Sequence, residues 1–93
     1  MDESARLEAT VRGIVQGVFF RHHTKLEADR LGLSGTVRNC PDGTVAVVAE
    51  GTRERLNQFL QWLHQGPSLA AVDRVDATWS AETGPYRDFR IMV

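Results

Sequence analysis

The sequence lacks several features that mark particular classes of protein. It has one cysteine, Cys40, which excludes an internal disulfide framework and fits a reducing cytosol. It has no apolar run of about 18 residues, the length that a membrane span needs, and its acidic N-terminus lacks the apolar segment of a secretory signal. A formal net charge of −1 argues against a nucleic-acid partner, because proteins that bind the phosphate backbone are usually basic. We therefore expect a cytoplasmic protein with neither a membrane nor a nucleic-acid partner.

The composition is that of one ordinary globular domain. Hydrophobic residues make up 42% of the chain and charged residues 25%, values typical of soluble domains. The sequence has no internal repeat, low-complexity stretch or linker. A chain of this length supports one hydrophobic core. We expect residues 1–93 to form a single domain and the protein to be a monomer.

The spacing of apolar residues predicts five strands and two helices. Strands are expected at 6–15, 33–39, 44–50, 71–80 and 89–93. One helix is expected at 21–31, and a second begins after the N-cap Thr52 and ends at Gly66. The order βαββαβ with a short final strand is that of the ferredoxin-like fold. The fold class is therefore α+β, a mainly antiparallel sheet covered by two helices on one face.

The stretch from 13 to 21, Gly-Ile-Val-Gln-Gly-Val-Phe-Phe-Arg, is the most informative in the chain. It leads from a predicted strand through a glycine-bearing loop into a predicted helix, with Arg21 in the first turn. Helix N-termini carry partial positive charge and favour Asp or Glu, so an arginine there is unfavourable until an anion binds. Backbone N–H groups, the helix dipole and the guanidinium would then all face that anion. The stretch predicts a small anion site, and phosphate is our first interpretation.

Asn39 stands at the end of the predicted strand 33–39, before the turn Cys-Pro-Asp-Gly. By composition it is a turn former. In the predicted topology, however, this strand ends beside the glycine-bearing loop, where an amide can hold a water molecule by accepting and donating hydrogen bonds. Both readings stay open from these residues alone.

Other site chemistries fit the sequence poorly. The loop has neither Walker A spacing nor Gly-x-Gly-x-x-Gly. Cysteine phosphatases carry Cys-x5-Arg, and Ala46 occupies the arginine position here. His22 and His23 are adjacent on a helix and point about 100° apart, so they cannot chelate one ion together. We expect no metal and no cofactor.

Two stretches resemble the signatures of the acylphosphatase family. Residues 11–21, Val-Arg-Gly-Ile-Val-Gln-Gly-Val-Phe-Phe-Arg, look like the first signature. Residues 35–45, Gly-Thr-Val-Arg-Asn-Cys-Pro-Asp-Gly-Thr-Val, with Gly51 six residues on, look like the second. One departure is Thr36, where the family usually has an aromatic residue. That departure concerns packing beside the hairpin more than chemistry.

The resemblance implies an enzyme that hydrolyses small acyl phosphates to a carboxylate and inorganic phosphate, without a metal and by direct attack of water. Arg21 matches the family's phosphate-binding arginine, and Asn39 matches its water-orienting asparagine. The backbone amides that cradle phosphate match four loop residues, Gln16, Gly17, Val18 and Phe19. The alternative is a non-catalytic phosphate-binding or regulatory module on the same fold, which would keep Arg21 and have no need of Asn39. The physiological acyl phosphate and any role of His22 and His23 stay open.

Overall fold

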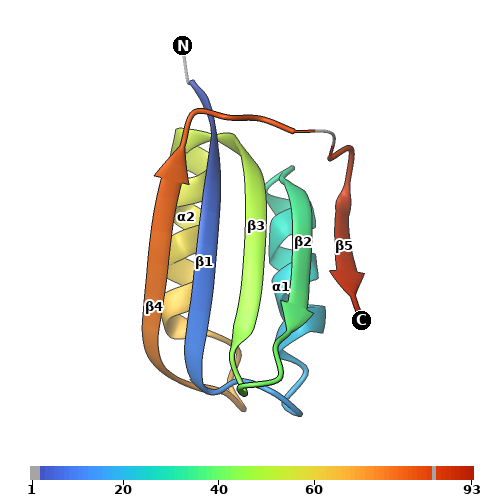
Figure 1. The fold of residues 1–93 in the computed structure, drawn as a ribbon, viewed down its shortest axis with the longest axis vertical. Coiled ribbons are helices and arrows are strands. Elements are labelled where there is room, and N and C mark those ends of the chain that lie inside the picture. Colours follow the sequence, from blue (N-terminus) through green and yellow to red (C-terminus); the bar gives the residue numbers. More distant parts are fainter. Residues whose placement is uncertain (1–2, 85) are drawn as a thin grey trace.

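Five strands form one sheet, and two helices cover one of its faces (Figure 1). The computed structural model describes residues 3–84 and 86–93. Met1, Asp2 and Pro85, which the expected single domain also covers, lie outside the described residues. The elements are β1 (Ser4–Ile14), α1 (Phe20–Arg30), β2 (Ser34–Asn39), β3 (Val45–Thr52), α2 (Arg53–Gln65), β4 (Ala71–Ser80) and β5 (Phe89–Met92). The predicted ferredoxin-like α+β fold is confirmed, and no boundary differs from its prediction by more than two residues.

The strand order is β4-β1-β3-β2-β5. β1 pairs antiparallel with β3 and β4, β2 pairs antiparallel with β3, and β5 runs parallel to β2 at one edge. The sheet is therefore mainly antiparallel, as predicted. This order places the end of β2 beside the loop that follows β1, at the lower end of the molecule in Figure 1.

A β-bulge lies near the end of β1, where the pairing with β4 shifts between Arg12 and Gly13. Gly13 has φ 129°, and a Cβ at this position would overlap the backbone carbonyl of Ala71. Only glycine combines this backbone conformation with so close an approach of the neighbouring strand. After the shift, β1 continues to pair with β4 through Gly13 and Ile14, and the chain then leaves the sheet for the loop 15–19.

The core lies between the sheet and the helices. Alternate residues of β1 are buried, which gives the period of two that the sequence predicts. Helix α2 buries Leu56, Phe59 and Leu63, and each such side chain contributes roughly 1.5–3 kcal/mol when fully buried. The ring of Phe59 contacts that of Phe89 at a centroid distance of 6.0 Å, so the final strand is part of the core. None of the helices among the described residues is long and apolar enough to cross a membrane.

The two helices begin in different ways. Thr52 Oγ1 accepts a hydrogen bond from the Arg55 N–H at 3.3 Å, which is the predicted N-cap of α2. Helix α1 begins at Phe20, one residue before the predicted start, and no side chain caps it. Phe20 joins Thr24 and Ala28 on the buried face of α1, so this face is wider than the sequence pattern suggests. The uncapped end of α1 is the end that the predicted anion site includes.

Candidate active site

The loop from Val15 to Phe19 delivers the chain from β1 to the start of α1. Gly17 has φ 74°, and Phe19, the N-cap residue, has φ 61° and ψ 24°. Phe19 is the one non-glycine residue with positive φ among residues 3–84 and 86–93. The first turn of α1 has no acidic residue and no side-chain cap. Its backbone N–H groups and positive dipole end are therefore available to an external anion.

Gln16 fixes this loop to the β2–β3 hairpin. Its Nε2 donates hydrogen bonds to the backbone oxygens of Cys40 and Thr44, both at 2.8 Å. This side-chain role is not predictable from the local pattern, because the partners lie 24 and 28 residues away along the chain. The contact holds the loop against the end of β2, where Asn39 lies.

The hairpin turn is itself closed by Asp42. The Asp42 carboxylate accepts hydrogen bonds from the Thr44 hydroxyl at 2.6 Å and from the Thr44 N–H at 3.0 Å. These bonds, the hydroxyl bond first, lower the pKa of the Asp42 carboxyl below its usual value. The Cys40 N–H also donates to Thr44 O at 2.8 Å. The two carbonyls that accept hydrogen bonds from Gln16 therefore belong to an ordered turn.

Arg21 and Asn39 line the same cavity, as the topology predicts. The cavity has a volume of about 300 Å³ and lies between the loop, the start of α1, and the ends of β2 and β5. Its described lining residues are Val15, Gly17, Phe19, Phe20, Arg21, His22, Asn39 and Ile91. Asn39 Oδ1 is buried and has no hydrogen-bond partner among the described residues. A buried acceptor of this kind is normally satisfied by water or a ligand.

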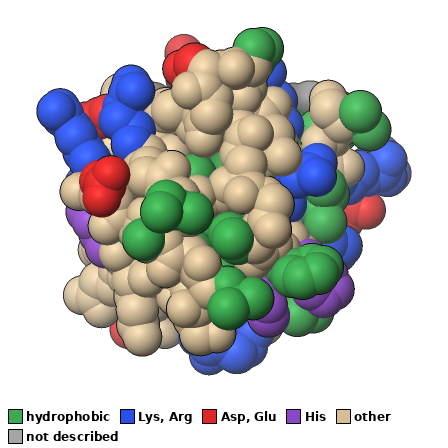
Figure 2. All heavy atoms as spheres, turned by 90° about the horizontal axis from the view of Figure 1, so that it is seen from below, with side chains coloured by type: hydrophobic (Ala, Val, Ile, Leu, Met, Phe, Trp, Pro, Cys, Tyr) green, Lys and Arg blue, Asp and Glu red, His purple; other side chains and the backbone are tan. Residues whose placement is uncertain are grey.

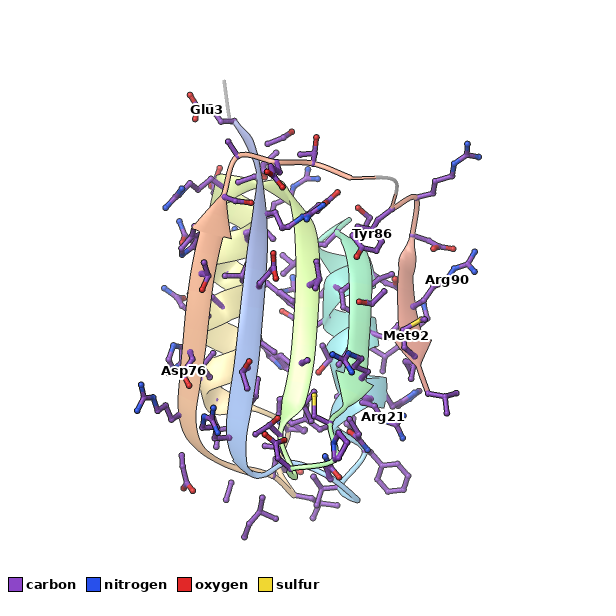
Figure 3. The ribbon with its side chains drawn as sticks, viewed as in Figure 1. Glu3, Arg21, Asp76, Tyr86, Arg90 and Met92 are labelled. Carbon is purple, nitrogen blue, oxygen red and sulfur yellow. The ribbon has the colours of Figure 1, made fainter. Side chains whose placement is uncertain are left out.

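Arg21 is held from the edge of the sheet. Its Nη1 donates to the backbone oxygen of Met92 at 3.3 Å, and Figure 3 shows the two residues near each other beside the end of β5. No carboxylate among the described residues forms an ion pair with Arg21, in contrast to Arg6, which is paired with Glu50. The positive charge of Arg21 is thus oriented but not neutralised.

The six predicted site residues lie together but do not all line the cavity. Arg21, Asn39, Gly17 and Phe19 line it. Val18 is half-buried and packs against the hydrophobic core. The side chain of Gln16 is committed to the hairpin, so any contact of residues 16 and 18 with a ligand would be through the backbone.

Residues that the sequence reasoning missed complete the cavity. Ile91 comes from β5, whose parallel pairing with β2 places it opposite Val37, two positions before Asn39. The alternation of the final strand could have placed Ile91 on the helix side of the sheet, but its pairing partner is not readable from the pattern. His22 also lines the cavity, and its ring lies 5.6 Å from that of His23. Among residues 3–84 and 86–93, no group of three metal-ligating side chains comes together.

The fold and cavity together define a class of protein: a small ferredoxin-like domain with an arginine-lined cavity between a strand–helix loop and a neighbouring hairpin. The model of the family described as acylphosphatase matches residues 7–91. The chain therefore belongs to the acylphosphatase family, a family of hydrolases, and the predicted membership of this family is confirmed.

Individual relatives agree over nearly the whole chain. An acylphosphatase of Paenarthrobacter aurescens (strain TC1) is 46% identical over 91 residues, which cover 98% of this chain and 97% of that protein. Among solved structures, the acylphosphatase from Bacillus subtilis superposes with a TM-score of 0.93 at 32% identity, covering 96% of this chain and 99% of that one. The acylphosphatase from Coxiella burnetii gives 0.92 at 38% identity, covering 97% and 94%.

Proposed function

We propose that this protein hydrolyses the carboxyl-phosphate bond of small acyl phosphates by direct attack of water, without a metal ion. The products are a carboxylate and inorganic phosphate. The observation that carries the proposal is the meeting of Arg21, the uncapped start of α1 and Asn39 around one cavity. Membership of the acylphosphatase family supports the same reaction.

Arg21 and the loop backbone would bind the phosphoryl group. The guanidinium offers charge-assisted hydrogen bonds to two phosphoryl oxygens, and the N–H groups of the loop and of the first turn of α1 offer others. These donors are fixed before substrate binds, because Gln16 anchors the loop and Met92 O holds Arg21. Donors arranged in advance stabilise the charge on the phosphoryl oxygens in the transition state without reorganising.

Asn39 would orient the attacking water. The unpartnered Oδ1 of Asn39 is a hydrogen-bond acceptor for one proton of the water, which directs an oxygen lone pair of the water toward phosphorus. An amide is too weak a base to take the proton, so the proton passes to a phosphoryl oxygen of the substrate. Positioning then supplies most of the rate enhancement.

The leaving group requires no acid. The bond that breaks joins phosphorus to a carboxylate oxygen, and a carboxylate departs as a stable anion without prior protonation. Because Arg21 and the backbone N–H groups neutralise the phosphoryl charge, the residues present can perform the functions that a metal ion performs in other phosphoryl-transfer sites.

A non-catalytic phosphate-binding module is the competing function. It would need Arg21 and the loop but would have no use for Asn39. Phosphate release from acetyl phosphate, measured with chelator present in the wild type and in Asn39→Ala, separates the two. If the wild type releases phosphate faster than the spontaneous rate and Asn39→Ala does not, the result supports hydrolysis. If the wild type binds phosphate but releases none above the spontaneous rate, the result supports the module.

We further propose that the protein acts as a monomer in the cytoplasm. Arg21, Asn39 and the loop residues that the proposed reaction uses meet around one cavity within a single chain, which supports a monomer. The single cysteine, Cys40, suits a reducing compartment. Sedimentation equilibrium across a range of protein concentrations tests the monomer, and fractionation of cells that produce the protein tests its location.

A further inference from the structure

We propose that the apolar wall of the cavity, formed by Phe19 and Ile91 over Val15, binds the acyl group, so that the protein prefers acyl phosphates with an apolar acyl chain. This inference rests on the proposed hydrolysis and names the substrate class within it. The cavity volume of about 300 Å³ exceeds what a phosphoryl group fills, so its walls also contact whatever the phosphoryl group carries.

The conformation of Phe19 points to a binding role. A bulky residue with φ 61° is a conformational outlier, and strain of this kind collects at functional sites. The side chain of Phe19 is 69% exposed, so burial in the core does not compensate for the strained backbone. Its ring instead lines the cavity that also contains Arg21. An exposed aromatic ring beside a cationic site offers an apolar contact to a ligand already held by its phosphate.

Ile91 supplies a second apolar contact from a different element. It lies on β5 opposite Val37, which brings it close to the end of β2 and to Asn39. Its side chain lines the cavity and is 39% exposed, while Val15 is fully buried beneath. Figure 2, which views the end of the molecule that carries the loops, shows hydrophobic side chains gathered on this surface.

The polar lining residues leave the acyl group without a second charged partner. Arg21 and Asn39 are assigned to the phosphoryl group and the water. Of the other described lining residues only His22 is polar, and none is a lysine or a second arginine. An acyl group with its own carboxylate or phosphate would therefore lack a strong cationic partner, whereas an alkyl or aromatic group would find Phe19 and Ile91. This chemistry favours apolar acyl chains.

The size of the effect follows from apolar burial. Complete burial of one methylene is worth about a fourfold change in an equilibrium constant, and an open cavity buries only part of each. We expect kcat/KM to rise about twofold per methylene from acetyl through butyryl to hexanoyl phosphate, which makes roughly a tenfold rise or more across the series. Succinyl phosphate, whose chain ends in a carboxylate, should fall below butyryl phosphate.

The test compares this chain-length dependence between variants, because a ratio of substrates is insensitive to a general loss of activity. Ile91→Thr keeps a β-branched residue suited to a strand and removes apolar surface. Phe19→Asn keeps a residue that tolerates the left-handed conformation and removes the ring. Both substitutions should reduce the rise of kcat/KM with acyl chain length to half of the wild-type value or less. Leu69→Ser is the matched control, since Leu69 is 68% exposed and does not line the cavity, and its dependence should equal that of the wild type.

The outcomes separate the inference from the proposed function. Hydrolysis of acetyl phosphate with no rise along the series, or with succinyl phosphate preferred, overturns the acyl site and leaves the hydrolase standing. The acyl site is also overturned if Leu69→Ser reduces the chain-length dependence of kcat/KM as much as Ile91→Thr does. No hydrolysis of any member of the series overturns both. A rise in the wild type that Ile91→Thr and Phe19→Asn flatten supports the acyl site.

Discussion

The side chain of Gln16 bridges two backbone oxygens of the neighbouring hairpin, those of Cys40 and Thr44, each 2.8 Å from its Nε2. This bridge sets the distance between the two halves of the site, since Arg21 follows the loop that Gln16 anchors and Asn39 precedes the hairpin turn. The relative position of Arg21, the proposed phosphate ligand, and Asn39, the proposed water-orienting residue, thus depends on Gln16, which lies outside the cavity.

Replacement of Gln16 should therefore impair activity more than stability. Both carbonyls keep a backbone donor, Gly43 N–H for Cys40 O and Cys40 N–H for Thr44 O. Gln16→Ala should cost about 0.5–1.5 kcal/mol of unfolding free energy, the net value of a hydrogen bond. Misplaced donors should lower kcat/KM for acetyl phosphate by about 10–100-fold. Urea unfolding and steady-state kinetics measure the two effects. Activity equal to that of the wild type would show that the bridge does not position the site.

Arg21→Gln should abolish phosphate affinity and turnover together. In the proposed mechanism the guanidinium binds the phosphoryl group in both the ground state and the transition state, so the loss of activity should exceed the 10²–10³-fold typical of one preorganised donor. Inhibition by inorganic phosphate and kcat/KM for acetyl phosphate are the measurements. Arg38→Gln is a suitable control, because Arg38 is exposed and does not line the site cavity. Phosphate inhibition that survives in Arg21→Gln would contradict the assignment.

Asn39→Ala should separate binding from turnover. The substitution removes the amide that we propose orients the water but leaves Arg21 and the loop intact, so kcat should fall about 10²–10³-fold while phosphate inhibition stays near its wild-type value. Asn39→Asp tests the same point, because a carboxylate accepts from water but repels the phosphoryl group and should weaken phosphate binding as well. If kcat for Asn39→Ala matches the wild type, another group orients the water.

The hairpin should weaken in acid through Asp42. Its pKa is lowered in the folded protein by the bonds from Thr44, so the ionised carboxylate stabilises the fold fully above its unfolded pKa of about 3.9. This stabilisation is lost as pH falls through the lower, folded value. Amide hydrogen exchange of the turn should accelerate below about pH 4 relative to the rest of the sheet. In Asp42→Ala the turn should exchange faster at neutral pH and change less on acidification. An equal acid response in both proteins would show that the carboxylate has no such role.

Glu50 should be important for stability at the end of the molecule away from the site. Its buried carboxylate, 6% exposed, forms an ion pair with Arg6 at 2.7 Å and accepts from the Gly84 N–H at 2.8 and 2.9 Å. The bond to Glu50 is also the main reason that the pKa of Arg6 is raised. Glu50→Ala should lower the melting temperature by roughly 5–15 °C. Phosphate inhibition should be unaffected, because the site is built by other residues. A melting temperature within a degree of the wild type would contradict this role.

Local patterns predicted most of the fold, because alternation in β1 and helical spacing in α2 directly reflect which side chains are buried. The meeting of Arg21 and Asn39 followed from topology. Three features did not follow. These are the parallel pairing of β5 with β2, the bridge from Gln16 and the left-handed backbone of Phe19. Each depends on tertiary contacts or loop geometry, which produce no periodic pattern in the sequence. These are also the features that shape the walls of the cavity.

The bond between Arg21 and Met92 has a consequence for sequence variation. The acceptor is a main-chain carbonyl, which every amino acid possesses, so selection for this bond leaves residue 92 free to change its identity. An insertion or deletion between 89 and 92 is different, because it would slide β5 along β2, present another carbonyl to Arg21 and move Ile91 away from the cavity. Related proteins should therefore tolerate substitutions at this position while keeping the length of the segment constant.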